Sequence, residues 1–330
     1  KKRDLPTLLP IPHKTLMRIL FLLLFLSLTP WISARDKPNI LFILADDLGY
    51  GDVSCYNPES KVPTPHLDRL AEEGMLFTDA HSPSTVCTPT RYSIMTGRMA
   101  FRLNYRGVFT GVGGPCLIEK DRLTLPAMLQ QQGYTTALFG KWHIAGTSVG
   151  PQGAGDTKYY PENQGFDLNI GGCIYGGPPT FFDPYRIHNL KNRHQGEYLP
   201  NRLADEVCKF ITTAGNTPFF TCLWNYSVHW PMEAPPDLLA KYESRKGPGL
   251  NDTRYGAMIE ALDTSFGKIM QYLENEGLSK NTLVIFTSDN GGFAGVSDNR
   301  PLRESKGHIY EGGIRDPLMS RWPKAIKPHE

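Results

Sequence analysis

The sequence has no strong excess of charge of either sign. Its 330 residues include 35 Lys and Arg against 33 Asp and Glu, which leaves a formal net charge of +2 at pH 7. There is no dense run of basic residues either, so nothing in the chain points to a nucleic-acid partner. A small anionic substrate remains compatible with this balance, because the local charge of a cleft decides such binding. Internal repeats and low-complexity tracts are also absent from the sequence.

Long apolar runs are scarce as well, and the clearest one lies near the N-terminus. Met17-Arg18 precedes a largely apolar run over residues 19–28, and the following segment ends in the small residue Ala34. This order is typical of a secretory signal peptide. The run is short for a transmembrane helix, which needs roughly twenty apolar residues, although an uncleaved anchor is the alternative. We expect an upstream extension and signal peptide over 1–34, with the start at Met17, and a mature domain over 35–330. That domain would be exported to the periplasm or the extracellular space, with no stable membrane insertion after cleavage.

Cysteine is sparse, and the spacing of the six cysteines matches no zinc pattern. In an exported chain, cysteines ordinarily suggest disulfides. If one of them is modified, an odd number remains and at most two pairs can form. Cys208 and Cys222 lie in apolar patterns, which favours buried thiols at these two positions.

Two kinds of hydrophobic pattern alternate along residues 39–288. Continuous apolar runs predict buried strands at 39–45, 135–139, 218–224 and 282–288. Amphipathic stretches predict helices at 64–74, 123–132, 202–214 and 252–276, and a further helix opens directly after Cys87. This alternation indicates an α/β fold with a mostly parallel, mixed central sheet and helices on both faces. The Gly-, Pro- and Asn-rich stretch 146–200 is expected to be an irregular excursion over the edge of the sheet.

Polar residues follow each of the four predicted strands. They are Asp46 and Asp47, then Lys141 and His143, then His229, and finally Asp289 and Asn290. Ligands of open α/β sheets bind beyond the carboxyl ends of the strands, so we expect these side chains to converge. The acidic and amide groups offer only oxygen ligands, which suit a hard cation such as Ca²⁺ or Mg²⁺. The alternative is that some of them are helix caps or turn formers, but a second acidic pair at another strand end favours the metal.

A short motif lies at the start of the helix predicted directly after Cys87. Cys87-Thr-Pro-Thr-Arg91 fits the signature Cys-x-Pro-x-Arg within residues 82–98, and Gly140-Lys-Trp-His143 and Tyr310-Glu-Gly-Gly313 follow in order. Together with the acidic pairs, these motifs resemble those of the type I sulfatases over residues 37–323. This is the arylsulfatase family of the alkaline phosphatase superfamily, and the chain resembles its exported bacterial members.

The resemblance implies an alkaline-phosphatase-like core and a set of site residues. Cys87 would be oxidised by a maturation enzyme to formylglycine, whose hydrate would be the nucleophile. Calcium would be bound by Asp46, Asp47, position 87, Asp289 and Asn290. Arg91 and Lys141 would hold the hydrate, His143 would act as a base, and His229 and Lys306 would grip the sulfate and assist the leaving group. The family also carries a smaller C-terminal antiparallel subdomain, which this sequence lacks, so we expect a C-terminally truncated catalytic domain.

In the mechanism that the resemblance implies, Asp289 helps to deprotonate one hydroxyl of the hydrate. That hydroxyl attacks sulfur, and His229 or Lys306 protonates the departing alcohol. His143 then takes the proton of the second hydroxyl, the aldehyde forms again, and sulfate leaves. This route makes the chain a sulfuric ester hydrolase, an enzyme acting on a sulfated small molecule or glycan, with sulfated carbohydrate as the expected substrate.

Two other functions stay open. One is a phosphodiesterase or phosphonate monoester hydrolase of the same superfamily, and the other is a non-catalytic binder of sulfated glycans. Trp142, Tyr175 and Trp230 could line a sugar subsite or could be core and loop residues. Five further histidines are left as structural or fringe positions: His66, His81, His188, His194 and His308.

Overall fold

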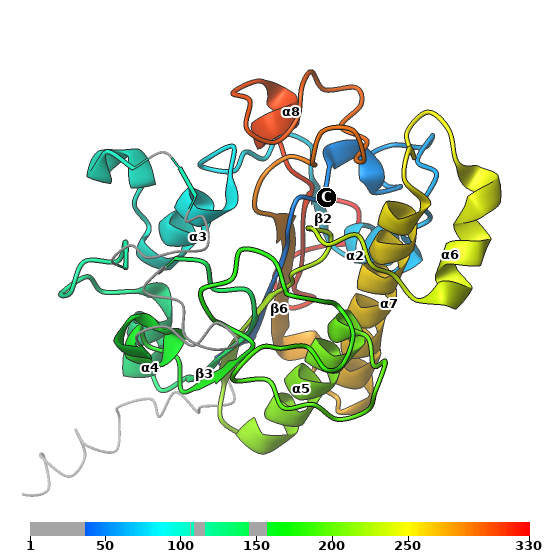
Figure 1. The fold of residues 1–330 in the computed structure, drawn as a ribbon. Helices are drawn as coiled ribbons and strands as arrows, with labels where there is room; N and C mark the ends of the chain where they lie inside the picture. The colour runs from blue at the N-terminus through cyan, green and yellow to red at the C-terminus, as the bar shows by residue number, and fades with distance from the viewer. Residues whose placement is uncertain (1–36, 106, 109–115, 145–156) are drawn as a thin grey trace, which may run out of the picture. The chain divides into compact units, whose positions relative to one another are not determined.

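A seven-stranded mixed sheet organises the part of the chain that the computed structural model describes, which is residues 37–105, 107–108, 116–144 and 157–330 (Figure 1). The upstream extension and signal peptide expected over 1–34 lie outside these residues. Within the described ranges, none of the helices is both long and apolar enough to cross a membrane.

The strand order is β2-β7-β6-β1-β5-β3-β4. Strands β6, β1, β5, β3 and β4 run parallel to one another, whereas β7 is antiparallel to both β6 and β2. In chain order the strands are β1 (Asn39–Ala45), β2 (Met75–Phe77), β3 (Thr135–Gly140), β4 (Leu168–Ile170), β5 (Phe219–Trp224), β6 (Thr282–Ser288) and β7 (Leu318–Arg321). The expected mostly parallel, mixed sheet is confirmed.

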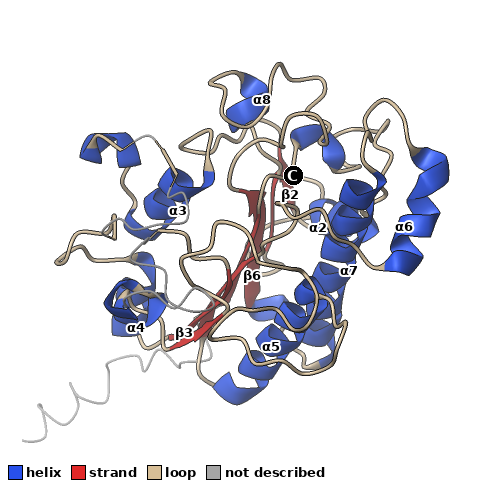
Figure 2. Cartoon of the chain, viewed as in Figure 1, coloured by secondary structure: helices blue, strands red, loops and turns tan. Residues whose placement is uncertain are grey.

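Helices cover both faces of this sheet, as the sequence predicts, and Figure 2 shows the two groups on opposite sides of the strands. On one face lie α2 (Pro65–Glu72), α5 (Leu199–Ala214) and α7 (Thr253–Asn275), and on the other lie α3 (Cys87–Thr96) and α4 (Leu125–Gln131). Helix α6 (Pro236–Tyr242) packs against α7. The remaining helical segments are α8 (Glu311–Ile314) and the short 3₁₀ turns Tyr50–Asp52, Ala100–Leu103, Thr157–Tyr159, Pro161–Asn163, Glu243–Arg245 and Ser279–Asn281.

The central strand β1 shows why both faces are covered. Successive side chains of a strand point to opposite faces, and Leu41 and Ile43 belong to the core under α2, α5 and α7, whereas Leu44 belongs to the core under α3 and α4. In this second core Trp142 stacks on Trp224, with ring centroids 6.1 Å apart, and is fully buried. Trp142 is therefore a core residue and does not line a sugar subsite.

Three short strands depart from the sequence-based expectation. The stretch 146–200 is not wholly irregular, because residues 168–170 form β4 at the edge of the sheet; residues 145–156 lie outside the described part. The edge strand β2 and its neighbour β7 have three and four residues, too few for a periodic pattern to reveal them. Helix α5 also begins earlier than expected, because Pro200 suits the first turn.

All six cysteines lie in the described ranges, and each is a free thiol. Cys222 is buried, as its apolar pattern predicts, and Cys208 is half-buried. The disulfide pairs allowed by the sequence are thus not formed in this structure.

Candidate active site

The polar residues after the strands are fixed by main-chain hydrogen bonds that continue the sheet beyond its ends. The Asp289 N–H donates to the carbonyl of Ala45 at 3.2 Å, and the Lys141 N–H donates to the carbonyl of Trp224 at 2.7 Å. The Asp46 N–H donates across to the segment after β5. The side chains predicted at four strand ends therefore lie together, as the position of ligand sites in α/β sheets requires.

Cys87 is the first residue of the ten-residue helix α3 and is buried. Its Sγ lies 3.4 Å from Nδ1 of His143, and it groups with carboxylate oxygens of Asp46 and Asp289 within 4.8 Å. Burial raises the pKa of the Cys87 thiol, and the charge of Lys141 opposes this shift. An unmodified Cys87 is therefore a protonated thiol at neutral pH, which makes it a poor nucleophile.

Each of the three carboxylates at the strand ends is paired with a cation. Arg91 donates from Nε and Nη2 to Oδ2 of Asp289, at 3.0 and 2.7 Å. The Nζ of Lys141 lies 2.6 Å from Oδ2 of Asp46.

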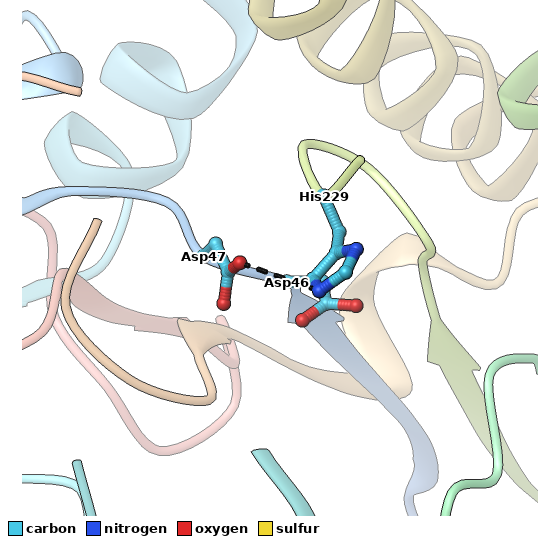
Figure 3. Close-up of side chains that lie close together, drawn as sticks. All are labelled: Asp46, Asp47 and His229. Carbon is cyan, nitrogen blue, oxygen red and sulfur yellow. Dashed lines mark ion pairs between the residues drawn. The ribbon is translucent and has the colours of Figure 1, made fainter. Parts of the chain in front are cut away.

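The third carboxylate, Asp47, has two basic neighbours. The Nζ of Lys306 lies 2.5 Å from its Oδ1, and Nε2 of His229 lies 3.7 Å from its Oδ2. Figure 3 shows the His229 ring directed at the two aspartates that follow β1. The two residues expected to grip sulfate therefore contact a predicted metal ligand.

The four acid–base groups differ in their electrostatics. Burial raises the pKa of Asp46, and burial together with the Asp46 charge raises the pKa of Asp289 to about 6. Burial acts in the same direction on Asp47, but the charge and the hydrogen bond of Lys306 bring its pKa below the ordinary value. Burial and the charge of Lys141 lower the pKa of His229 to about 4, so its imidazole is neutral at pH 7.

Three buried oxygen atoms of this cluster have no hydrogen-bond partner: Oδ1 of Asp46, Oδ2 of Asp47 and Oδ1 of Asn290. The amide of Asn290 is oriented by its Nδ2, which donates to Oδ1 of Asp47 at 2.8 Å. Buried polar atoms are rarely left unpaired, and hard cations take oxygen ligands of this kind. The residues present therefore fit a hard divalent cation.

Backbone conformation and close approach shape the site in ways that the sequence does not reveal. Asp47 and His143 both have positive φ, 64° and 54°, which is uncommon for residues with a side chain. A Cβ added at Gly176 would lie 2.8 Å from two ring atoms of His143. One added at Gly177 would lie 2.8 Å from Nδ1 of His229. The glycine-rich stretch thus packs its backbone against both histidines.

Other histidines make contacts of a structural kind. His81 contacts Glu311 with its Nε2 at 3.2 Å, and the ring of His188 packs against Tyr160. Nδ1 of His308 lies 3.3 Å from the carbonyl oxygen of Ser305, to which it can donate, and its side chain is about half exposed.

The sheet, with a buried cluster of carboxylates and cations beyond its parallel strand ends, defines an α/β protein of the alkaline-phosphatase-like class. The chain belongs to the sulfatase family, whose model matches residues 38–330.

Relatives and solved structures agree with this assignment. Human arylsulfatase A is 32% identical over 92% of this chain and 63% of its own length. An N-acetylgalactosamine-6-O-sulfatase of Bacteroides thetaiotaomicron is 30% identical over 89% of this chain and 69% of its own. The crystal structure of Ps i-CgsB in complex with k-i-k-neocarrahexaose superposes with a TM-score of 0.78 and 29% identity, over 89% of this chain and 67% of that one. The chain thus spans about two thirds of the length of these relatives.

Proposed function

We propose that the protein is a sulfuric ester hydrolase that is exported and acts on sulfated carbohydrates. The observation that carries this proposal is the position of Cys87. The cysteine of the Cys-x-Pro-x-Arg signature is buried as a protonated thiol between a histidine and the two carboxylates that Arg91 and Lys141 neutralise. A thiol in this place does little chemistry itself, so its role is to be modified. Oxidation to formylglycine would supply a hydrated aldehyde as the nucleophile.

The unpaired oxygens of the cluster support the proposed choice of metal ligands. Asp46, Asp47 and Asn290 would bind Ca²⁺, or Mg²⁺ as the second choice, together with Asp289 and the side chain at position 87. The cation would add positive charge to the cluster and polarise an oxygen of the substrate.

The protein's own residues then have separate tasks. His143 lies beside position 87, so it can take a proton from the side chain there. Arg91 and Lys141 fix the carboxylates on either side of that position. His229 and Lys306 form the opposite group around Asp47 and are placed to contact the sulfate and to assist the departing alcohol.

Sulfated carbohydrate is favoured by the relatives. They include N-acetylgalactosamine-6-sulfatases from mammals and an N-acetylgalactosamine-6-O-sulfatase from Bacteroides thetaiotaomicron. A solved neighbour is bound to an oligosaccharide. A non-catalytic binder is disfavoured, because every predicted metal, nucleophile and acid–base position is present and lies in one cluster.

The test has two parts: detection of the modified side chain at position 87 and measurement of sulfate release. The protein should be produced in a host that has a formylglycine-generating enzyme, and peptides across residue 87 should be weighed by mass spectrometry. We expect loss of sulfur and gain of an aldehyde oxygen. The protein should then release sulfate from nitrophenyl sulfate and from a panel of sulfated monosaccharides that includes N-acetylgalactosamine 6-sulfate.

Two variants and one comparison complete the experiment. Cys87→Ala and Asp46→Asn should lose at least a thousandfold of the activity, and chelation should do the same. Nitrophenyl phosphate should be hydrolysed more slowly than nitrophenyl sulfate; the reverse order would favour the phosphoryl hydrolase. An intact thiol in fully active protein would refute the proposal. N-terminal sequencing of exported protein tests the expected cleavage before Arg35.

A further inference from the structure

Two exposed aromatic side chains contact each other on loops that follow the strands of the site. The rings of Trp230 and Phe293 meet nearly edge to face, with centroids 6.3 Å apart and an interplanar angle of 78°. Their exposed fractions are 40% and 37%. Large aromatic side chains usually bury most of their surface. This pair, though packed together, keeps over a third of each residue in water.

The main chain of Trp230 contacts His229, one of the two basic residues beside Asp47. The carbonyl of Trp230 lies 3.0 Å from Nδ1 of His229, whose other ring nitrogen faces Asp47. The backbone of Gly177 leaves no room for a Cβ against this carbonyl, at 2.4 Å. The main chain that presents the indole is therefore held between the histidine and the glycine-rich stretch.

The segment that carries Phe293 is hydrogen-bonded to Lys306, the other basic residue beside Asp47. Gly292 precedes Phe293 and accepts a hydrogen bond at its carbonyl from the N–H of Lys306 at 3.0 Å. The carbonyl of Phe293 accepts from the N–H and the Oγ of Ser297. Two loops that place His229 and Lys306 beside Asp47 thus each carry one ring of the pair.

Two other exposed aromatic side chains of the described part, Phe101 and Tyr310, contact an arginine and have no such ring-to-ring contact. The Tyr310 ring is covered by the guanidinium of Arg303, 3.9 Å from its centroid. Phe101 is 57% exposed on the 3₁₀ turn after α3, and its ring packs with Arg102. The pair of Trp230 and Phe293 is therefore distinguished by a ring-to-ring contact and by attachment to both loops.

Such a surface suits the apolar face of a sugar ring. Pyranose rings expose C–H groups on one face, and aromatic side chains bury these while hydroxyl groups remain in water. We propose that Trp230 and Phe293 form a platform for the carbohydrate part of the substrate, and that they determine specificity for a sugar over a plain alcohol. This inference rests on the proposed sulfatase function and names the part of the substrate that the cluster around Asp47 does not contact.

The test uses Trp230→Ala, Phe293→Ala and Trp230→Phe in the metal-loaded, formylglycine-bearing protein. The substrate is the sulfated monosaccharide that the wild type hydrolyses fastest. Loss of either ring should lower kcat/KM about tenfold through KM, and Trp230→Phe should stay within about threefold of the wild type. The main-chain carbonyl at residue 230 is kept in every variant, so the contact with His229 survives.

Two measurements distinguish loss of sugar binding from a general disturbance of the structure. Inhibition by inorganic sulfate, which occupies only the charged cluster, should be unchanged in all three variants. Phe101→Ala, an exposed aromatic elsewhere, should leave kcat/KM on the sugar unchanged. If both alanine variants keep the wild-type KM for the sugar, the platform is refuted. If the wild type hydrolyses nitrophenyl sulfate but no sugar, the platform is refuted while the sulfatase proposal stands.

Discussion

Replacement of Arg91 by methionine tests whether the buried ion pairs stabilise the fold as the structure indicates. Arg91 is fully buried, donates two hydrogen bonds to Asp289, and donates a third from Nη1 to the Lys141 carbonyl at 3.1 Å. Methionine keeps much of the volume but leaves the Asp289 carboxylate without its counter-charge. Removing one partner of a buried pair costs about 3–5 kcal/mol of unfolding free energy. That is a large part of the 5–15 kcal/mol that holds an ordinary domain together.

A second substitution, Asp289→Asn, makes the test more specific, because its effect on stability should have opposite signs in two backgrounds. Asp289→Asn in the wild type places an amide group against the guanidinium of Arg91, so it should destabilise the protein. In the Arg91→Met background the same change removes an unpaired buried charge, so it should stabilise the protein by at least about 1 kcal/mol. One substitution is therefore expected to act in opposite directions in the two backgrounds.

The measurement is urea unfolding followed by tryptophan fluorescence, in a chelator so that no cation replaces the lost arginine. Arg69→Met is the matched control, because Arg69 pairs with Glu73 at 2.6 Å with side chains 54% and 32% exposed. This exposed pair should contribute less than about 1 kcal/mol. If Asp289→Asn shifts both backgrounds equally, the pair carries no coupling energy and the reasoning about this cluster is wrong.

Three further predictions concern the glycine-rich stretch, the cation and a buried acid. Gly176→Ala should lower kcat at least tenfold, because its Cβ would lie 2.8 Å from the His143 ring, whereas Gly107→Ala, whose Cβ would meet no atom of the described residues within 4 Å, should change nothing. Chelation should lower Tm, and Ca²⁺ at a hundred times its Kd should restore about 2.7 kcal/mol; equal Tm values with and without the ion would contradict the site. Burial raises the pKa of Asp52 to about 7 from 3.8, so the folded state retains a proton that the unfolded chain releases. Stability from this group is thus lost as the pH rises from about 4 to 7, by up to about 1.4 kcal/mol per pH unit. Asp52→Asn should remove that slope in unfolding measurements, and an unchanged slope would refute the assignment.

The central part of the fold could be predicted because its signals are long and local. The strand at 39–45 is a continuous apolar run, and the structure places β1 over the same residues. Strand β4 could not be predicted, since three residues inside a glycine-rich stretch carry no pattern and pair only because β3 lies beside them. The role of Trp142 was equally hidden, because an aromatic residue next to a motif can face a cleft or the core.

The residues of the site also differ in whether a local sequence pattern predicts them. Its charged members stand directly after strands, so topology alone brings Asp46 and Asp289 together. Gly176 and Phe293 act through contacts between segments far apart in sequence, and no local pattern marks them. The partner of each charge was also beyond prediction: Lys306 contacts Asp47 only because its loop folds back over the end of β6.

The balance of charge in the cluster explains what a bound cation adds. Three carboxylates and three cations face one another, carried by Asp46, Asp47, Asp289, Arg91, Lys141 and Lys306. These charges balance formally, and the His229 ring adds none at neutral pH, so a bound divalent ion would give the cluster its net positive charge. With that ion, the excess positive charge favours sulfate esters and the more highly charged phosphate esters alike. Charge therefore cannot select the substrate, and selection must come from the side chain at position 87 and from the surface beyond the cluster. For this reason relative turnover, and not relative binding, of nitrophenyl sulfate and nitrophenyl phosphate distinguishes the two hydrolases.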